Sequence, residues 1–160
     1  MRRLALFSAV LWLGACAVLT GEEKKEPAKI EPTEEEKAVV EFTNRARAKE
    51  KLPPLKLNPV LLQVARAHTE NMAKTGKVEH DLDGKTSADR VKEAGYRARV
   101  VGENISKGEG RFPPEAVVMG WMMSKGHREN IVSDEFTEIG VGIAKVGKVT
   151  YYTQVFATPR

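Results

Sequence analysis

The sequence predicts an α+β domain in which helices and strands pack in layers. Three observations lead to this class. The chain has 160 residues, 41% hydrophobic and 30% charged, which allows one soluble globular domain and not two. Capped amphipathic segments are frequent, and a β-branched hairpin lies near the C-terminus. Helices and strands do not alternate strictly, which argues against a doubly wound parallel sheet.

Two long helices are expected first. Residues 33–36 form a capping box, and apolar residues then recur on one face of a helix that runs to about Lys51. Residues 58–59 supply an N-cap followed by proline at the first helical position, and this second helix ends at Gly76.

Two further helices follow. A short one is expected over residues 88–94, capped by Ser87 and closed by Gly95. Another begins at residues 113–115 and turns Val117 and Trp121 inward.

Strand signals occupy the rest of the domain. Residues 139–143 alternate apolar and small side chains, residues 147–148 are suited to a turn, and residues 149–156 are β-branched and aromatic. These segments predict a hairpin. Residues 97–101 are the candidate for a third strand.

The N-terminal segment predicts export. Arg2 and Arg3 precede an apolar run over residues 4–12, shorter than the roughly 20 residues of a membrane-spanning helix. Residues 13–16 end in Cys16, the single cysteine, and resemble the lipobox of bacterial lipoproteins. We therefore expect a signal peptide over residues 1–15, a lipidated Cys16 and flexible linker over residues 16–33, and the domain over residues 34–160. The alternative is an ordinary signal peptide cut near residue 15, which leaves the protein secreted.

The basic charge belongs to the globular part. Residues 37–160 hold 21 Lys and Arg against 15 Asp and Glu. This excess is consistent with anionic lipid or wall polymer nearby. Export and the lack of interleaved aromatic and basic residues argue against nucleic-acid binding. We expect a monomer held to the membrane by its lipid anchor.

Few polar residues are candidates for catalysis or metal binding, and each of them also has an ordinary structural interpretation. His80 can be an exposed loop histidine, Glu103 a helix or loop cap, and His127 a cation at a helix C-terminus. Two imidazoles and a carboxylate could instead form an open zinc site, although no short metal-binding spacing is present. His68 is expected to be a hydrogen-bonded core residue. Core or cleft-wall positions are expected for the aromatic residues Trp121, Tyr151, Tyr152 and Phe156.

The order of short segments along the domain resembles the CAP superfamily of cysteine-rich secretory, antigen 5 and pathogenesis-related 1 proteins, especially its bacterial SCP-like branch. The segments lie at residues 44–47, 55–59, 65–68 with 72–73, 76–80, 95–96, 102–105, 121 with 124–131, 136 with 140–142, and 151–156.

This resemblance implies an α-β-α sandwich with a central antiparallel sheet between helical layers. It also implies a cleft that holds His80, Glu103 and His127, with the two histidines as ligands for zinc or another divalent cation. Ser124 stands where plant and animal members carry a second glutamate, which weakens metal affinity and puts a two-carboxylate mechanism in doubt.

Three functions remain open at this point. The first is a membrane-anchored module that binds a lipid or cell-envelope ligand in the His/Glu cleft, on the outer membrane if the organism has two membranes. The second is a metal-assisted or serine hydrolase acting on peptide or wall material, with Glu103, Ser124 and His127 as candidate catalytic residues, although no oxyanion hole is marked. The third is an interaction protein in which the polar residues only tie loops to the sheet.

Overall fold

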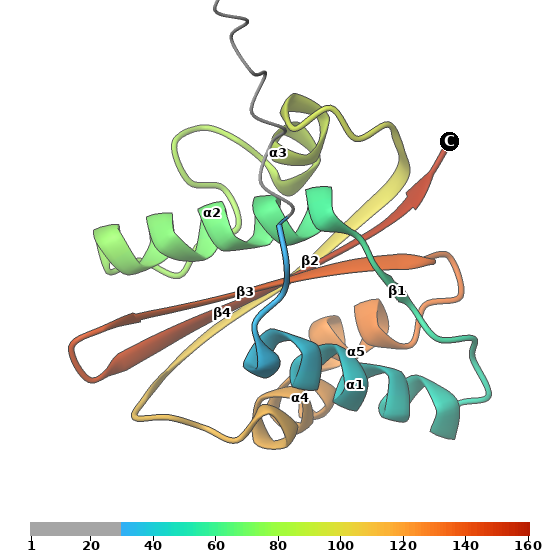
Figure 1. Ribbon diagram of the computed structural model, residues 1–160, viewed down its shortest axis with the longest axis horizontal. Helices are drawn as coiled ribbons and strands as arrows, with labels where there is room; N and C mark the ends of the chain where they lie inside the picture. The colour runs from blue at the N-terminus through green and yellow to red at the C-terminus, as the bar shows by residue number, and fades with distance from the viewer. Residues whose placement is uncertain (1–29) are drawn as a thin grey trace, which may run out of the picture.

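A four-stranded sheet lies between two layers of helices in the computed structural model, which describes residues 30–160. Helices α2 and α3 cover one face of the sheet, and α1, α4 and α5 cover the other (Figure 1). The predicted α+β sandwich is therefore confirmed. The expected signal peptide, Cys16 and most of the linker lie outside the described residues. Within residues 30–160, no helix is long and apolar enough to cross a membrane.

The elements follow the order helix, strand, helix, helix, strand, helix, helix, strand, strand. Their bounds are α1 Glu34–Lys49, β1 Lys56–Leu57, α2 Pro59–Thr75, α3 Ser87–Glu93, β2 Ala98–Glu109, α4 Pro114–Met123, α5 Lys125–Ile131, β3 Glu138–Val146 and β4 Val149–Pro159.

The strands are ordered β1-β3-β4-β2, so that β1 and β2 form the two edges. The pairs β3–β4 and β2–β4 are antiparallel, as expected, and the β3–β4 hairpin turns at residues 147–148. The short strand β1 pairs parallel with β3 and has no counterpart in the sequence prediction. Two residues are too few to produce an alternating pattern.

The capping residues start both long helices where the sequence predicts. Thr33 accepts from the backbone of Glu36, and the Glu36 carboxylate accepts from the backbone of Thr33 at 2.7 Å. The Asn58 side chain accepts from the first turn of α2, and Gly76 ends that helix with a left-handed φ of 72°.

The structure differs from the sequence analysis in three places. Helix α3 is capped by Thr86, whose hydroxyl accepts from the backbone of Asp89, and not by Ser87. Helix α5 was not predicted, because its N-cap Ser124 makes no side-chain capping bond and its sequence is mostly polar. Strand β2 runs to Glu109, so Glu103 lies in a strand and not at a helix or loop cap.

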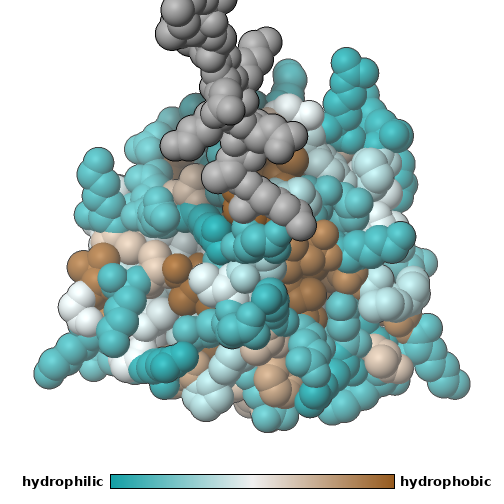
Figure 2. Space-filling model, viewed as in Figure 1, coloured by the Kyte–Doolittle hydropathy of each residue, from teal (hydrophilic) through white to brown (hydrophobic). Residues whose placement is uncertain are grey.

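The central strand β4 divides the core between the two faces. Val155 packs in a cluster with residues of α2 and α3, whereas Tyr152 and Phe156 pack with residues of α1, α4 and α5. This alternation is the period of two expected for a strand buried on both sides. Figure 2 shows hydrophobic residues gathered across the middle of one face of the molecule, between mostly hydrophilic upper and lower margins.

Candidate functional site

Glu103 lies on the edge strand β2 and turns its side chain toward the α2–α3 layer. Its register partner Val155 packs in the cluster on that side, and the Glu103 side chain is only 2% exposed. A buried carboxylate requires compensation by partners of opposite charge or by hydrogen bonds. The surroundings of Glu103 supply both.

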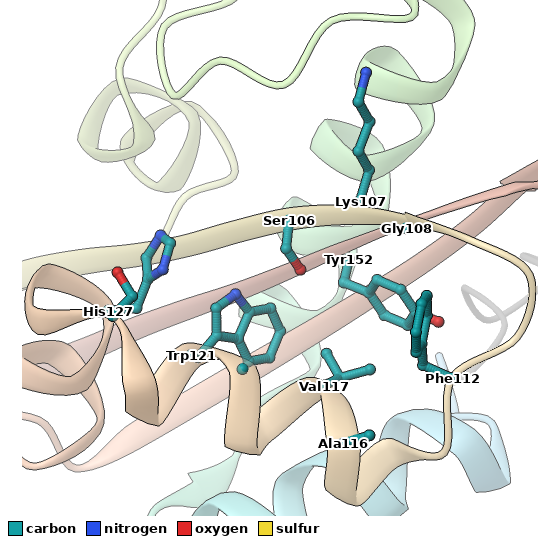
Figure 3. Close-up of a pocket in the computed structure, with 11 residues that line it drawn as sticks. Ser106, Lys107, Gly108, Phe112, Ala116, Val117, Trp121, His127 and Tyr152 are labelled. Carbon is teal, nitrogen blue, oxygen red and sulfur yellow. The ribbon is translucent and has the colours of Figure 1, made fainter.

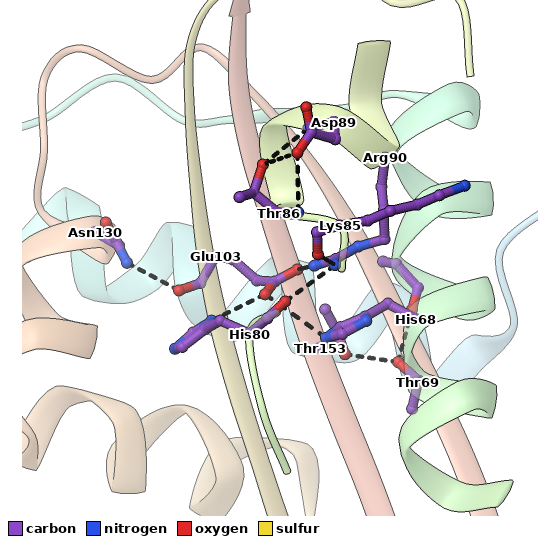
Figure 4. A network of polar contacts seen from close by, with 11 residues as sticks. His68, Thr69, His80, Lys85, Thr86, Asp89, Arg90, Glu103, Asn130 and Thr153 are labelled. Carbon is purple, nitrogen blue, oxygen red and sulfur yellow. Dashed lines mark hydrogen bonds and ion pairs between the residues drawn. The ribbon is translucent and has the colours of Figure 1, made fainter. Parts of the chain in front are cut away.

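Two side chains hold the Glu103 carboxylate, one on each oxygen (Figure 4). Arg90 donates to Oε2 at 2.6 Å, and Nδ1 of His80 lies 2.9 Å from Oε1. The guanidinium of Arg90 also donates to the backbone carbonyls of His80 and Lys85. One arginine from α3 therefore neutralises Glu103 and fixes the loop that carries His80.

His80 is half exposed beside this carboxylate. The hydrogen bond to Glu103 raises the pKa of His80 above its ordinary value of 6.5, and partial burial opposes that rise. The imidazolium form is therefore favoured relative to a free histidine. The partner of His80 on the sheet is the buried Glu103 carboxylate, so the pair combines an exposed group that can exchange a proton with a buried side chain that is held in place.

His68 lies on α2, behind the same carboxylate. Its side chain is fully buried, and Nε2 is 3.7 Å from Oε1 of Glu103. Burial lowers the pKa of His68, while the charge of Glu103 opposes this effect. The prediction of a core position was right. Within residues 30–160 neither ring nitrogen has a hydrogen-bond partner of standard geometry, and the only backbone contact that acts on the pKa of His68 comes from Glu79.

His127 and Ser124 lie across the edge strand from Glu103. Both line a cavity of about 370 Å³ between β2 and α4. His127 is in the first turn of α5, not at a helix C-terminus as one interpretation proposed, and the positive end of a helix does not favour a protonated imidazole. Burial, followed by the charge of His80, lowers the pKa of His127.

The walls of this cavity are mostly apolar (Figure 3). Phe112, Val117, Trp121 and Tyr152 line it, and Lys107 contributes backbone while its side chain points away. The side chains of Ser106, Ser124 and His127 add polar groups to the lining. Such a combination of apolar walls and few polar groups is typical of small-molecule sites.

Two asparagines fix α5 against β2. Asn104 donates to the backbone carbonyl of His127 at 3.0 Å, and Asn130 donates to the backbone carbonyl of Glu103 at 3.1 Å. The strand therefore connects the two halves of the site through its backbone and side chains together. Sequence reasoning did not assign this role to Asn130, nor any role to Arg90, because a polar residue on a short helix gives no sign of a partner far along the chain.

The four predicted site residues thus fall into two pairs that meet across β2. His80 contacts Glu103, and Ser124 shares a cavity with His127. The charge of His80 lowers the pKa of His127, a contribution second to burial, so the two halves of the site interact electrostatically.

The donor set does not fit a tightly held zinc ion. Among residues 30–160, no group of three or more His, Cys, Asp or Glu side chains is arranged to hold a metal. Both oxygens of Glu103 are engaged by Arg90 and His80, which leaves two imidazoles where zinc sites usually have three or four protein ligands.

Comparison with known proteins decides the family. Residues 40–156 match the model of the cysteine-rich secretory protein family, CAP. The chain belongs to the CAP family. Its relatives include two Bacillus subtilis proteins, the uncharacterized protein YkwD, 41% identical over 122 residues, and the uncharacterized membrane protein YlbC, 33% identical over 125 residues. These matches cover 76% and 78% of this chain but 46% and 34% of the relatives, so this CAP chain spans less than half of either.

Solved structures share the fold of this chain. An extracellular protein with an SCP domain from Bacillus anthracis has a TM-score of 0.70 and 29% identity, over 77% of this chain and 40% of that one. An outer surface protein from Borrelia burgdorferi has a TM-score of 0.75 and 21% identity, over 82% of this chain and 98% of that one.

Proposed function

We propose that this CAP domain is an extracytoplasmic binding module that takes a lipid or cell-envelope ligand at the site around β2. The observation that carries the proposal is the cavity of about 370 Å³, walled by Trp121, Tyr152 and Val117 and bordered by Ser124 and His127. An acyl chain fits apolar walls, and a polar head group fits the histidine side.

The state of Glu103 supports binding over catalysis. A general base must lie within hydrogen-bond reach of the substrate proton that it removes. Both carboxylate oxygens of Glu103 already accept, from Arg90 and His80. The carboxylate is also only 2% exposed, so it is suited to fixing Arg90 and His80 rather than to contacting a substrate.

The hydrolase alternative rests on Ser124 and His127, which line the same cavity. Among residues 30–160, no hydrogen bond joins their side chains, and Ser124 makes no capping bond. The alternative predicts turnover of peptide, ester or wall substrates that is lost in Ser124→Ala. Absence of turnover in the unmodified chain, with or without zinc, would remove it.

Fluorescence quenching tests the binding proposal directly. Trp121 is one of two tryptophans, and the other, Trp12, lies in the predicted signal peptide; a Trp12→Phe variant therefore makes Trp121 the single reporter even in unprocessed chain. We expect a brominated fatty acid to quench Trp121. Ala116→Phe, which places a ring in the cavity, should abolish the quenching, whereas Met119→Phe on the same helix but outside the cavity should not. Equal quenching in both variants would contradict the proposal.

Zinc binding by His80 and His127 stays a prediction. With two imidazoles and an engaged carboxylate, we expect weak binding that is lost in His127→Ala. Isothermal titration of a Cys16→Ser variant with zinc measures it without interference from the thiol. Tight binding with one zinc per chain would contradict this expectation.

The extracytoplasmic location is part of the same proposal. Its support is the predicted signal at residues 1–16 and the similarity to an extracellular SCP-domain protein. Metabolic labelling with palmitate in a bacterial host should modify the chain and spare Cys16→Ser. Labelling that persists in the Cys16→Ser variant would contradict a lipid anchor at Cys16.

A further inference from the structure

A second and larger hollow lies away from the His/Glu site, between α3, the start of β2 and the end of the chain after β4. Its volume is about 870 Å³, and it shares no lining residue with the cavity that holds Ser124 and His127. Figure 1 shows these three segments together at one corner of the molecule. We refer to this hollow as the basic groove.

Four cationic side chains line the basic groove, and the lining contains no acidic side chain. They are Lys92 on α3, Arg97 in the connection to β2, Arg99 on β2 and Arg160 at the chain end. All four residues are exposed, and none forms an ion pair within residues 30–160. Other arginines of this domain, such as Arg90, are paired with carboxylates.

Irregular backbone places two of these cations. The register of β2 against β4 shifts between Ala98 and Val100, so Arg99 is the extra residue of a bulge. A bulge redirects the side chain of the residue that it leaves unpaired. The chain end is fixed nearby, because the backbone of Arg160 donates to the Arg97 carbonyl and its side chain donates to the Ala98 carbonyl, both at 3.0 Å.

Acidic side chains on the elements around the basic groove have other partners, and the Arg99 side chain reaches only the backbone carbonyl of Glu135, at 3.5 Å. The carboxylate of Glu138 accepts from the hydroxyl of Tyr96 and from the side chain of Asn58. Asp89, one helical turn before Lys92, accepts from the Thr86 cap. The positive charge of the basic groove therefore has no carboxylate bound to it at ion-pair distance.

We propose that the basic groove binds a linear phosphate-bearing polymer. Guanidinium groups form paired hydrogen bonds with phosphate oxygens, and such charge-assisted bonds are among the strongest at protein surfaces. One phosphate offers acceptors to one or two arginines, whereas four cations around a groove of this size match several phosphates in series. This site is independent of the proposed ligand in the cavity beside Ser124.

The test is titration of the full chain with short sodium polyphosphate, read by calorimetry at physiological salt. We expect saturable binding that weakens about tenfold or more in the double variant Arg97→Gln/Arg99→Gln. The matched control is Lys145→Gln/Lys148→Gln, which removes the same charge from exposed positions on the β3–β4 hairpin and should change affinity less than about twofold.

Several results would overturn the proposal. No binding of polyphosphate is one, and equal losses in the groove and hairpin variants is another, because equal losses indicate attraction by net charge alone. Binding to phosphatidylglycerol vesicles without binding to polyphosphate would replace the polymer by a membrane surface. A second variant, Lys92→Gln/Arg160→Gln, removes the other two cations of the basic groove. Weaker binding in this variant at an unchanged melting temperature shows that the site, and not the fold, is lost.

Discussion

The two faces of the sheet are packed in different ways. On one face, α2 lies so near β3 that a β-carbon built on Gly140 would be 2.0 Å from the carbonyl carbon of Leu61. On the other, α4 and β2 leave a cavity of about 370 Å³ beside Trp121. On the α2 face, contact of backbone with backbone closes the centre of the sheet and gives it a rigid support, whereas the hollows on both faces lie beside the edge strand β2.

Substitution of Gly140 tests the closed face most severely. Gly140→Val places side-chain atoms on the backbone of α2, and we expect the free energy of unfolding to fall by about 3 kcal/mol or more. Urea denaturation followed by circular dichroism measures it. Gly126→Ala in α5, where a β-carbon would meet nothing within 4 Å, should change stability by no more than about 1 kcal/mol. A Gly140→Val protein of unchanged stability would end the distinction between the faces.

The next largest effect is expected at the buried ion pair beside the open face. Glu103→Gln leaves the charge of Arg90 without its carboxylate, and we expect a loss of about 3 kcal/mol in unfolding free energy. Glu41→Gln, which breaks an exposed pair with Arg45, should cost less than about 1 kcal/mol. Similar losses in the two variants would show that burial does not distinguish the pairs.

Stability should depend on pH in opposite ways at two histidines. The pKa of His68 is lowered by burial, so its contribution is present above about pH 6.5 and is lost as the pH falls. The pKa of His80 is raised by Glu103, so its contribution is present below about pH 6.5 and is lost as the pH rises. His68→Met should flatten the loss on the acid side, and His80→Ala the loss on the alkaline side, in urea midpoints across pH 5 to 8.

The smallest expected effect is a change in the pKa of His127, caused by substitution of His80 in the other half of the site. His80 lowers the pKa of His127 by charge repulsion, a contribution second to burial. His80→Ala should therefore raise the pKa of His127 slightly while leaving it below the ordinary value. Two-dimensional NMR of the imidazole protons measures the change. An unchanged pKa would mean that the two halves of the site are electrostatically separate.

The parts of the fold that follow from local chemistry were predictable. The capping box at Thr33, the Asn58 cap and the β3–β4 hairpin each result from residues close together in the chain. Helix α5 and the two-residue strand β1 were not, because tertiary contacts hold them. Asn104 and Asn130, for example, bind α5 to β2 across more than twenty residues of sequence.

The candidate site was predicted only in its residue types. The resemblance to CAP proteins named His80, Glu103 and His127, but no spacing indicated which of them would touch. Arg90 was missed, as was Asn130, because the role of Arg90 depends on the packing of α3 against the edge strand β2. The split of the site by β2 likewise follows from strand alternation around residue 103, which became evident only once that segment was known to be extended.

Several parts of the candidate site depend on the single side chain of Arg90. The same guanidinium that balances Glu103 also grips the carbonyls of His80 and Lys85. Substitution of Arg90 would free the loop that carries His80 and at the same time leave the buried Glu103 carboxylate without its counter-ion. Position 90 should therefore tolerate substitution far less well than its place on a short surface helix implies. Variation that tunes ligand preference in this branch of the family is therefore expected on the α4 side, where side chains can change without undoing the clamp.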